Sequence, residues 1–293
     1  MTTSAMTTMP LELVGLTALM ERTSGHPDLK VGVIDGPVAT RHPDLTSEHV
    51  REIRGPRGAT CTRTNSTACL HGTFVAGILS ARRGSVAPAI CPGCTLLVRP
   101  IFSETATTTA EMPSATPEEL AEAIFDCIVA GARVLNVSAA IARPTIRSEY
   151  ALGAALDHAA KRGVIVVAAA GNQGTLGSTA ITRHPWVIPV IGYDRQGRPM
   201  THSNLGSSIG QRGLGAPGAQ ITSLGADGTP LTLSGTSAAA PFVTGAIALL
   251  WSAFPAATAA ELKRAATLTS GHRRTTVVPP LMDALAALRL MRN

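Results

Sequence analysis

Five short apolar runs alternate along the chain with helical patterns, and this alternation is the sequence feature that most restricts the possible folds of the chain. The apolar runs cover residues 30–35, 95–102, 132–138, 163–170 and 186–193, and the helical patterns cover 71–82, 116–131 and 146–163. Runs that are apolar throughout are typical of parallel strands buried on both faces. The sequence therefore predicts an α/β fold of three layers, with a mostly parallel central sheet and helices on both faces.

Two of the helical segments also have recognisable ends. Thr116 precedes Pro117 and two glutamates, which predicts an N-cap and a first turn. Gly163 follows a basic last turn, as at many helix C-termini. No repeat or break in composition divides residues 30–293, so we expect one domain there. In the extension 1–29, apolar residues at helical spacing predict a helix docked permanently on that domain: Leu13, Leu16, Leu19 and Met20.

Composition and charge exclude several classes of function. With 293 residues, 45% of them hydrophobic, the chain can bury a sizeable core. The net charge of +6 comes from scattered basic residues, and aromatic residues make up only 3%, so a nucleic-acid partner is not expected. The sequence shows neither a secretory signal nor a run of about 20 apolar residues, which predicts a cytoplasmic protein without a membrane partner.

The five cysteines leave three arrangements open. Cys61 and Cys69 lie close together, Cys91 and Cys94 form a C-x-x-C pair, and Cys127 stands alone. Two short disulfides, free thiols in a reducing compartment, and a zinc site are all compatible with this spacing. The C-x-x-C pair precedes a predicted strand instead of opening a helix, which favours a structural staple over a redox role.

Polar residues stand at the ends of several predicted elements. Asp35 closes the first strand, His71 opens the helix in CLHGTFVAGIL, and Asn172 follows the fourth strand. Ser237 begins an apolar helix in LSGTSAAAPFVTGAIALL, where Pro241 would cost no hydrogen bond if the helix starts near the serine. Each residue alone fits a turn, a helix start or a cap. At the carboxyl edge of one sheet they can converge, and a serine with a base and an orienting acid is a nucleophile.

Four segments carry a family resemblance. VGVIDGPV, HGTFVAG, VVAAAGNQG and SGTSAAAPFVTGAIALL resemble, in order, the Asp, His, Asn and Ser blocks of the subtilisin-like serine proteases. The resemblance implies that Asp35 orients His71 and that His71 takes the proton of Ser237, which attacks the peptide carbonyl. The Asn172 side chain and the Ser237 backbone N–H would form the oxyanion hole. Residues 30–293 would then be the catalytic domain.

Further features of the sequence restrict the metal sites and the reaction that we expect of this family member. The segment ARRGSVAPAI is short where many secreted members have a calcium loop, and no acidic cluster replaces it, so we expect neither a metal site of that kind nor a cofactor. VIDGPVATRHPDL and CPGCTLLVRPIF resemble the PatA-type and PatG-type proteases that mature ribosomally made peptides. His71 follows Asp35 by only 36 positions, which favours hydrolysis over macrocyclisation, because macrocyclising members carry an insertion there.

The same resemblance implies a peptide-binding edge. An extended substrate would add as a strand beside NVSAAI, and the first specificity pocket would be walled by small residues. We expect Ser138, Ala139, Ala140, Ala169 and Gly171 to contact substrate.

Two alternatives to proteolysis remain for this fold, namely a silent subtilase fold that only binds a peptide, and a peptide macrocyclase. An esterase of the α/β-hydrolase type is disfavoured, because that fold places its serine before its histidine. The sequence leaves the oligomeric state open.

Overall fold

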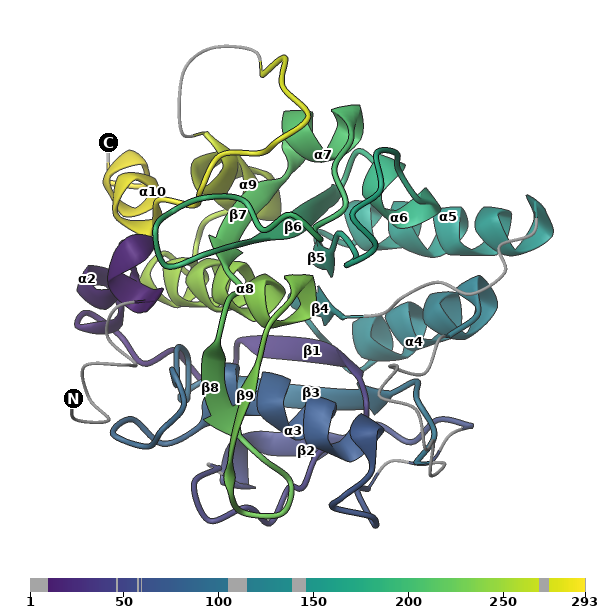
Figure 1. The fold of residues 1–293 in the computed structure, drawn as a ribbon, viewed down its shortest axis with the longest axis vertical. Coiled ribbons are helices and arrows are strands. Elements are labelled where there is room, and N and C mark those ends of the chain that lie inside the picture. The colour runs from purple at the N-terminus through teal and green to yellow at the C-terminus, as the bar shows by residue number, and fades with distance from the viewer. Residues whose placement is uncertain are drawn as a thin grey trace.

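The computed structural model describes residues 10–45, 47–56, 58, 60–104, 115–138, 146–268 and 274–292. A seven-stranded sheet runs through its centre in the order β2-β3-β1-β4-β5-β6-β7, and every neighbouring pair is parallel (Figure 1). The strands are β1 (Lys30–Asp35), β2 (Val50–Glu52), β3 (Thr95–Pro100), β4 (Val134–Val137), β5 (Ile165–Ala169), β6 (Val187–Tyr193) and β7 (Leu214–Pro217). The predicted parallel α/β sheet is thus confirmed.

The five predicted strands form the middle of the sheet, and the pattern missed its two edges. β2 has three residues, VRE, of which two are exposed, so it has no apolar run to recognise. β7 reads LGAP, and glycine and proline are poor strand formers. A separate antiparallel hairpin, β8 (Ile221–Leu224) and β9 (Pro230–Leu233), leads into the helix that carries Ser237. The edge strands β2 and β7 are stabilised by the parallel strands beside them, and this stabilisation is not visible in the local sequence pattern.

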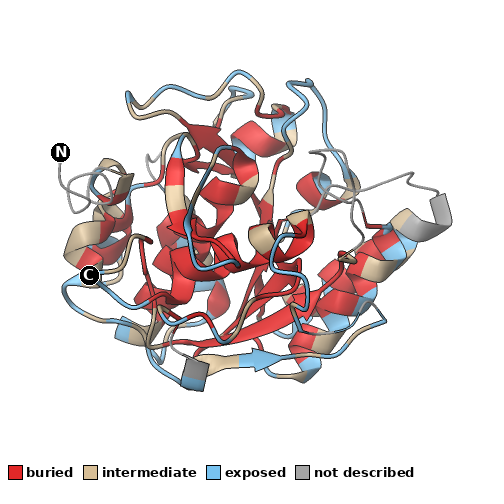
Figure 2. Ribbon diagram, turned by 60° about the horizontal axis from the view of Figure 1, so that its bottom comes forward, coloured by how far each residue is buried: buried red, intermediate tan, exposed pale blue. Residues whose placement is uncertain are grey.

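Helices cover both faces of the sheet, as predicted. α3 (Thr67–Ser80) and α8 (Thr236–Ala253) pack on one face, and α4 (Pro117–Val129) and α5 (Ile146–Lys161) pack on the other. Alternate side chains of each central strand enter one of two apolar cores, so that Val33 faces α3 and α8 while Ile34 faces α4 and α5. Figure 2 shows the resulting burial of the sheet and its covering helices. The remaining helices are η1 (Ser47–His49), α2 (Leu16–Met20), α6 (Ala180–Arg183), α7 (Ser207–Arg212), α9 (Ala259–Thr267) and α10 (Ala284–Leu290).

Two helices begin earlier than the sequence indicated. The side chain of Ser66 accepts a hydrogen bond from the Cys69 N–H and caps α3, which starts at Thr67, so His71 lies in the second turn and does not open the helix. α8 starts at Thr236, and the Ala239 N–H already bonds to the Gly235 carbonyl, so Pro241 lies beyond the free first turn. Pro241 therefore does remove one hydrogen bond, the one that the Ser237 carbonyl would otherwise accept.

The N-terminal segment packs on the main domain. α2 lies against α8 and α10, near the C-terminal end of the chain (Figure 1), and its Leu16 and Leu19 are fully buried in the larger core. Arg83 holds the end of this segment, because its guanidinium donates to the carbonyls of Met20 at 2.6 Å and Thr23 at 2.9 Å. α8 is long and apolar enough to cross a membrane, but 83% of it is buried inside the protein, as expected of a core helix.

Candidate active site

Asp35, His71 and Ser237 form a continuous chain of hydrogen bonds. Asp35 is the last residue of β1, and its Oδ1 lies 2.7 Å from the Nδ1 of His71. The other ring nitrogen of His71, Nε2, lies 2.9 Å from the Oγ of Ser237. Residues separated by 166 positions along the chain are thereby brought into one site. Both distances suit the activation of a serine by a histidine that a carboxylate orients.

The acid end of this chain is shielded from solvent. Asp35 is fully buried and His71 is 5% exposed, whereas Ser237 is partly exposed and accessible to a substrate. The Asp35 Oδ1 also accepts the Gly36 N–H at 2.6 Å, while its buried Oδ2 has no hydrogen-bond partner in the part of the chain that the structure describes. A buried carboxylate in contact with an imidazole stabilises the protonated ring.

Two glycines allow α3 to approach the end of β1 closely. A Cβ on Gly72 would lie 2.3 Å from the carbonyl oxygen of Gly36, and a Cβ on Gly36 would lie 2.0 Å from that of Ala68. Both separations are far below van der Waals contact, so no other residue fits without moving the backbone. The glycines after Asp35 and after His71 thus set the distance between these two side chains.

Asn172 lies beside the nucleophile. Its Oδ1 accepts the backbone N–H of Thr236 at 2.9 Å, which fixes the carbonyl side of the amide and turns the Nδ2 donor away from that bond. Ser237 is the second residue of α8, so its own N–H lies among the helix donors that have no intrahelical acceptor. An amide side chain and a helix-start N–H next to one serine oxygen are suitable donors for an oxyanion.

Asn204 supports the loop that carries Asn172, and no sequence signal pointed to it. Its Oδ1 accepts the N–H groups of Gln173 at 3.0 Å and Thr175 at 3.1 Å, and its Nδ2 donates to the Ala170 carbonyl and the Gln173 side chain. Asn204 stands 32 positions after Asn172 in a turn of ordinary composition. Only the folded chain shows that it spans the loop on both sides of Asn172.

The predicted substrate-contact residues fall partly within the described chain. Ser138 follows β4, and Ala169 ends β5; Val137 and Ala168 are register partners, so both positions leave the same edge of the sheet. Gly171 lies in the next turn with φ of 104°. Ala139 and Ala140 lie outside the described residues.

Asn136 and Thr244 form a buried pair that holds the Ser138 side chain, and sequence reasoning did not identify this pair. Thr244 on α8 donates to the Asn136 Oδ1 at 2.9 Å, and the Asn136 Nδ2 donates to the Ser138 Oγ at 3.0 Å. In the sequence, the asparagine of NVS is recognisable only as part of a strand end. Its contact with a helix more than 100 positions away is not visible in the sequence.

The cysteines separate into one disulfide and three free thiols. Cys61 and Cys69 are joined, whereas Cys91, Cys94 and Cys127 are free and buried. The C-x-x-C pair is therefore present as two thiols, one of the arrangements that the sequence left open. Its two thiols share a hydrogen bond, which raises the pKa of Cys91 and lowers that of Cys94.

Comparison with known proteins identifies the family. Residues 27–283 match the Subtilase family, peptidase S8, and the chain belongs to it. Subtilisin E from Bacillus subtilis (strain 168) is 30% identical over 243 residues, which cover 80% of this chain and 58% of the subtilisin. The chain thus spans less than two thirds of that relative's full length.

Solved structures share the fold over nearly the whole chain. A mutant of the protease domain of PatA is 28% identical, has a TM-score of 0.79, and is matched over 92% of this chain and 96% of its own. The prenylagaramide maturation protease PagA is 27% identical with a TM-score of 0.79, over 94% and 98%. The expected subtilisin-like fold and the likeness to maturation proteases are both confirmed.

Proposed function

We propose that this protein is a serine endopeptidase in which Ser237 attacks the carbonyl carbon of a peptide bond. The observation that carries the proposal is the hydrogen-bonded chain from Asp35 through His71 to Ser237. His71 accepts the serine proton through Nε2 as the C–O bond forms, and it later gives that proton to the leaving amine. The buried Asp35 carboxylate holds the ring and stabilises its protonated form. Water then hydrolyses the acyl-enzyme by the same route.

The negative charge of the tetrahedral intermediate falls on the former carbonyl oxygen. In our proposal the Asn172 Nδ2 and the Ser237 backbone N–H donate to that oxygen. Both donors are held before substrate arrives, Asn172 by its bond to the Thr236 N–H and the backbone by the start of α8. Loss of one such donor lowers turnover by about 10²–10³ in enzymes of this kind.

The substrate is a ribosomally made precursor peptide, bound as an extended strand beside Ser138 and processed in the cytoplasm. Support comes from the likeness to PagA, described as a prenylagaramide maturation protease, and to the protease domain of PatA. The short connection between Asp35 and His71 favours hydrolysis over cyclisation. β4 and β5 end side by side at Val137 and Ala168, and in our proposal the peptide strand lies beyond these ends.

A peptide library read by mass spectrometry tests this function. Wild-type protein should cut defined bonds and yield linear products carrying one added water, whereas Ser237→Ala should cut none. Ser85→Ala, a serine outside the hydrogen-bonded chain from Asp35 to Ser237, serves as the matched control and should cut as wild type does. Products that lack the added water would identify a macrocyclase, and peptide capture without any cleavage would identify a binding module.

A further inference from the structure

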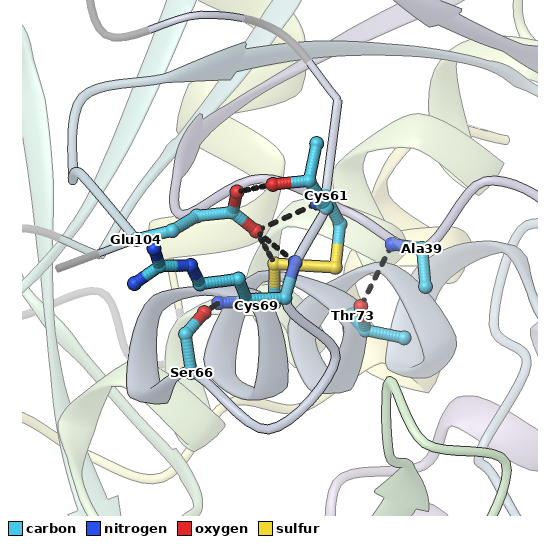
Figure 3. The surroundings of a disulfide bond; sticks show 8 residues. Ala39, Cys61, Ser66, Cys69, Thr73 and Glu104 are labelled. Atoms are coloured by element: carbon cyan, nitrogen blue, oxygen red, sulfur yellow. Dashed lines mark hydrogen bonds between the residues drawn. A yellow bond between two sulfur atoms is a disulfide. The ribbon is translucent and has the colours of Figure 1, made fainter. Parts of the chain in front are cut away.

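Cys61, Cys69 and Glu104 bring three metal-binding atoms together outside the proposed catalytic chain. Their two sulfurs and one carboxylate oxygen all lie within 4.8 Å of one another (Figure 3). Cys69 belongs to the first turn of α3, and Cys61 and Glu104 lie in segments before and after that helix. The Cys61–Cys69 disulfide occupies these sulfurs in the structure.

The Glu104 carboxylate is held firmly against the sulfur of Cys69. Its Oε1 accepts the backbone N–H groups of Thr62 at 2.8 Å and Arg63 at 3.0 Å, and its Oε2 accepts the Thr62 hydroxyl at 2.5 Å. These three hydrogen bonds orient the carboxylate.

In the disulfide state, the Cys69 Sγ offers no hydrogen-bond donor to the Glu104 Oε1 that it contacts. A disulfide sulfur carries no proton, so the carboxylate oxygen gains no hydrogen bond from it. The same oxygen would accept a hydrogen bond from a thiol, or would bind a metal ion beside a thiolate. Reduction would therefore give this oxygen a hydrogen-bond donor or a metal ion that the disulfide does not provide.

We propose that Cys61, Cys69 and Glu104 form a zinc site when the disulfide is reduced. A dithiol reductant opens the S–S bond and is itself oxidised to a disulfide. The two thiols then each release one proton as two Zn–S bonds form. Zinc takes thiolate sulfur and carboxylate oxygen as ligands at about 2.3 Å and 2.0–2.2 Å in a tetrahedral arrangement, and a water molecule would fill the fourth position.

The surroundings suit such an ion. Hydrogen bonds that orient a ligating carboxylate are a regular feature of zinc sites, and Thr62 and Arg63 supply them here. The three ligands bring three negative charges, which the zinc ion and the Arg63 guanidinium together offset. A cavity of about 500 Å³ lined by Thr60, Cys61 and Thr64 gives reductant and metal a route to the cysteine pair.

The site also lies close to the proposed catalytic base. Cys69 precedes His71 by two residues on α3. In the disulfide state the S–S bond ties the segment around Cys61 to the first turn of this helix, and in the reduced state zinc would make the same connection. Reduction without metal would remove this link, while the Ser66 cap and the Glu104 contact would remain at the start of the helix.

Zinc titration of one polypeptide in two redox states tests the proposal. Full-length protein is reduced with a dithiol, freed of reductant without oxygen, and titrated with Zn²⁺ against a chromophoric chelator. We expect one zinc per chain in the reduced protein and none at this site in the oxidised protein. Co²⁺ in place of Zn²⁺ should give the visible absorption of a tetrahedral thiolate complex.

Variants assign the ligands. The double variant Cys61→Ser with Cys69→Ser should lose the zinc, and Glu104→Gln should weaken binding at least about 10-fold, as should Thr62→Val through the carboxylate it orients. Glu122→Gln, an exposed glutamate on α4, should bind zinc as wild type does. Reduced wild type that binds no zinc would overturn the proposal. So would zinc retained by the Cys61 and Cys69 double variant, or lost on replacing Cys91 and Cys94, which would assign the ion to the C-x-x-C pair.

Discussion

Replacing Asn204 with alanine should lower turnover although Asn204 touches neither the nucleophile nor the base. The side chain makes three hydrogen bonds to backbone groups on either side of Asn172, with Gln173, Thr175 and the Ala170 carbonyl. Each of these hydrogen bonds contributes roughly 0.5–1.5 kcal/mol. Because the loop is exposed, water can replace part of this contribution in the variant. The variant therefore loses about 2 kcal/mol of the free energy that positions the loop. If all of it is felt in the transition state, kcat falls about 30-fold. The decrease in kcat should not exceed the factor of about 10²–10³ that is expected when the Asn172 donor itself is removed.

Steady-state hydrolysis of a chromogenic peptide measures this effect. Asn204→Ala should lower kcat and leave KM nearly unchanged, and Asn65→Ala, an exposed asparagine in the turn before α3, should change neither. Because Asn204 acts through Asn172, the double variant Asn172→Ala with Asn204→Ala should be no slower than Asn172→Ala alone. Additive losses in the double variant, or wild-type kcat in Asn204→Ala, would refute the reasoning.

Three further outcomes follow from the same structure. His71→Ala should lose about as much kcat as Ser237→Ala, because the two act as a unit and their losses do not add; a clearly milder loss would remove His71 from the role of base. Activity should fall when the pH is lowered, because a general base accepts a proton only in its neutral form, and equal rates at pH 5 and pH 9 would contradict this. Burial, together with the charge of Arg212, lowers the pKa of Lys263 to about 8. The unfolded chain then binds more protons between about pH 8 and the ordinary lysine value near 10.4, so stability should rise with pH across that window. Thermal unfolding of Lys263→Met should show a smaller rise, and an unchanged pH dependence would refute the assignment.

The sequence located the proposed catalytic residues because their positions follow from topology. Asp35 ends one buried strand and Asn172 follows another, where parallel sheets gather their ligands, and Ser237 stands at the start of an apolar helix. The apolar runs themselves predicted the sheet, since central strands must be apolar on both faces. The edge strands β2 and β7 were not predicted, because they are short and depend on the strands beside them.

What the sequence did not predict depends on contacts between distant segments. The Asn204 loop contacts and the Asn136–Thr244 pair arise only when separate turns and helices meet. Spacing also could not decide between disulfide and thiol for the cysteines, because each pair is close enough along the chain to close a ring. The start of α3 was missed for another reason, since its short first turn follows a polar loop and only the Ser66 cap marks it.

Labelling with a fluorophosphonate tests the central claim most directly. This reagent bonds covalently to a serine oxygen only where a neighbouring base activates it and donors stabilise the charged intermediate. Intact-mass and peptide mass spectrometry should show one adduct per chain, located on Ser237, with labelling slowed strongly in His71→Ala. An unlabelled wild-type protein, or an adduct on another serine, would contradict the assignment of Ser237 as the nucleophile.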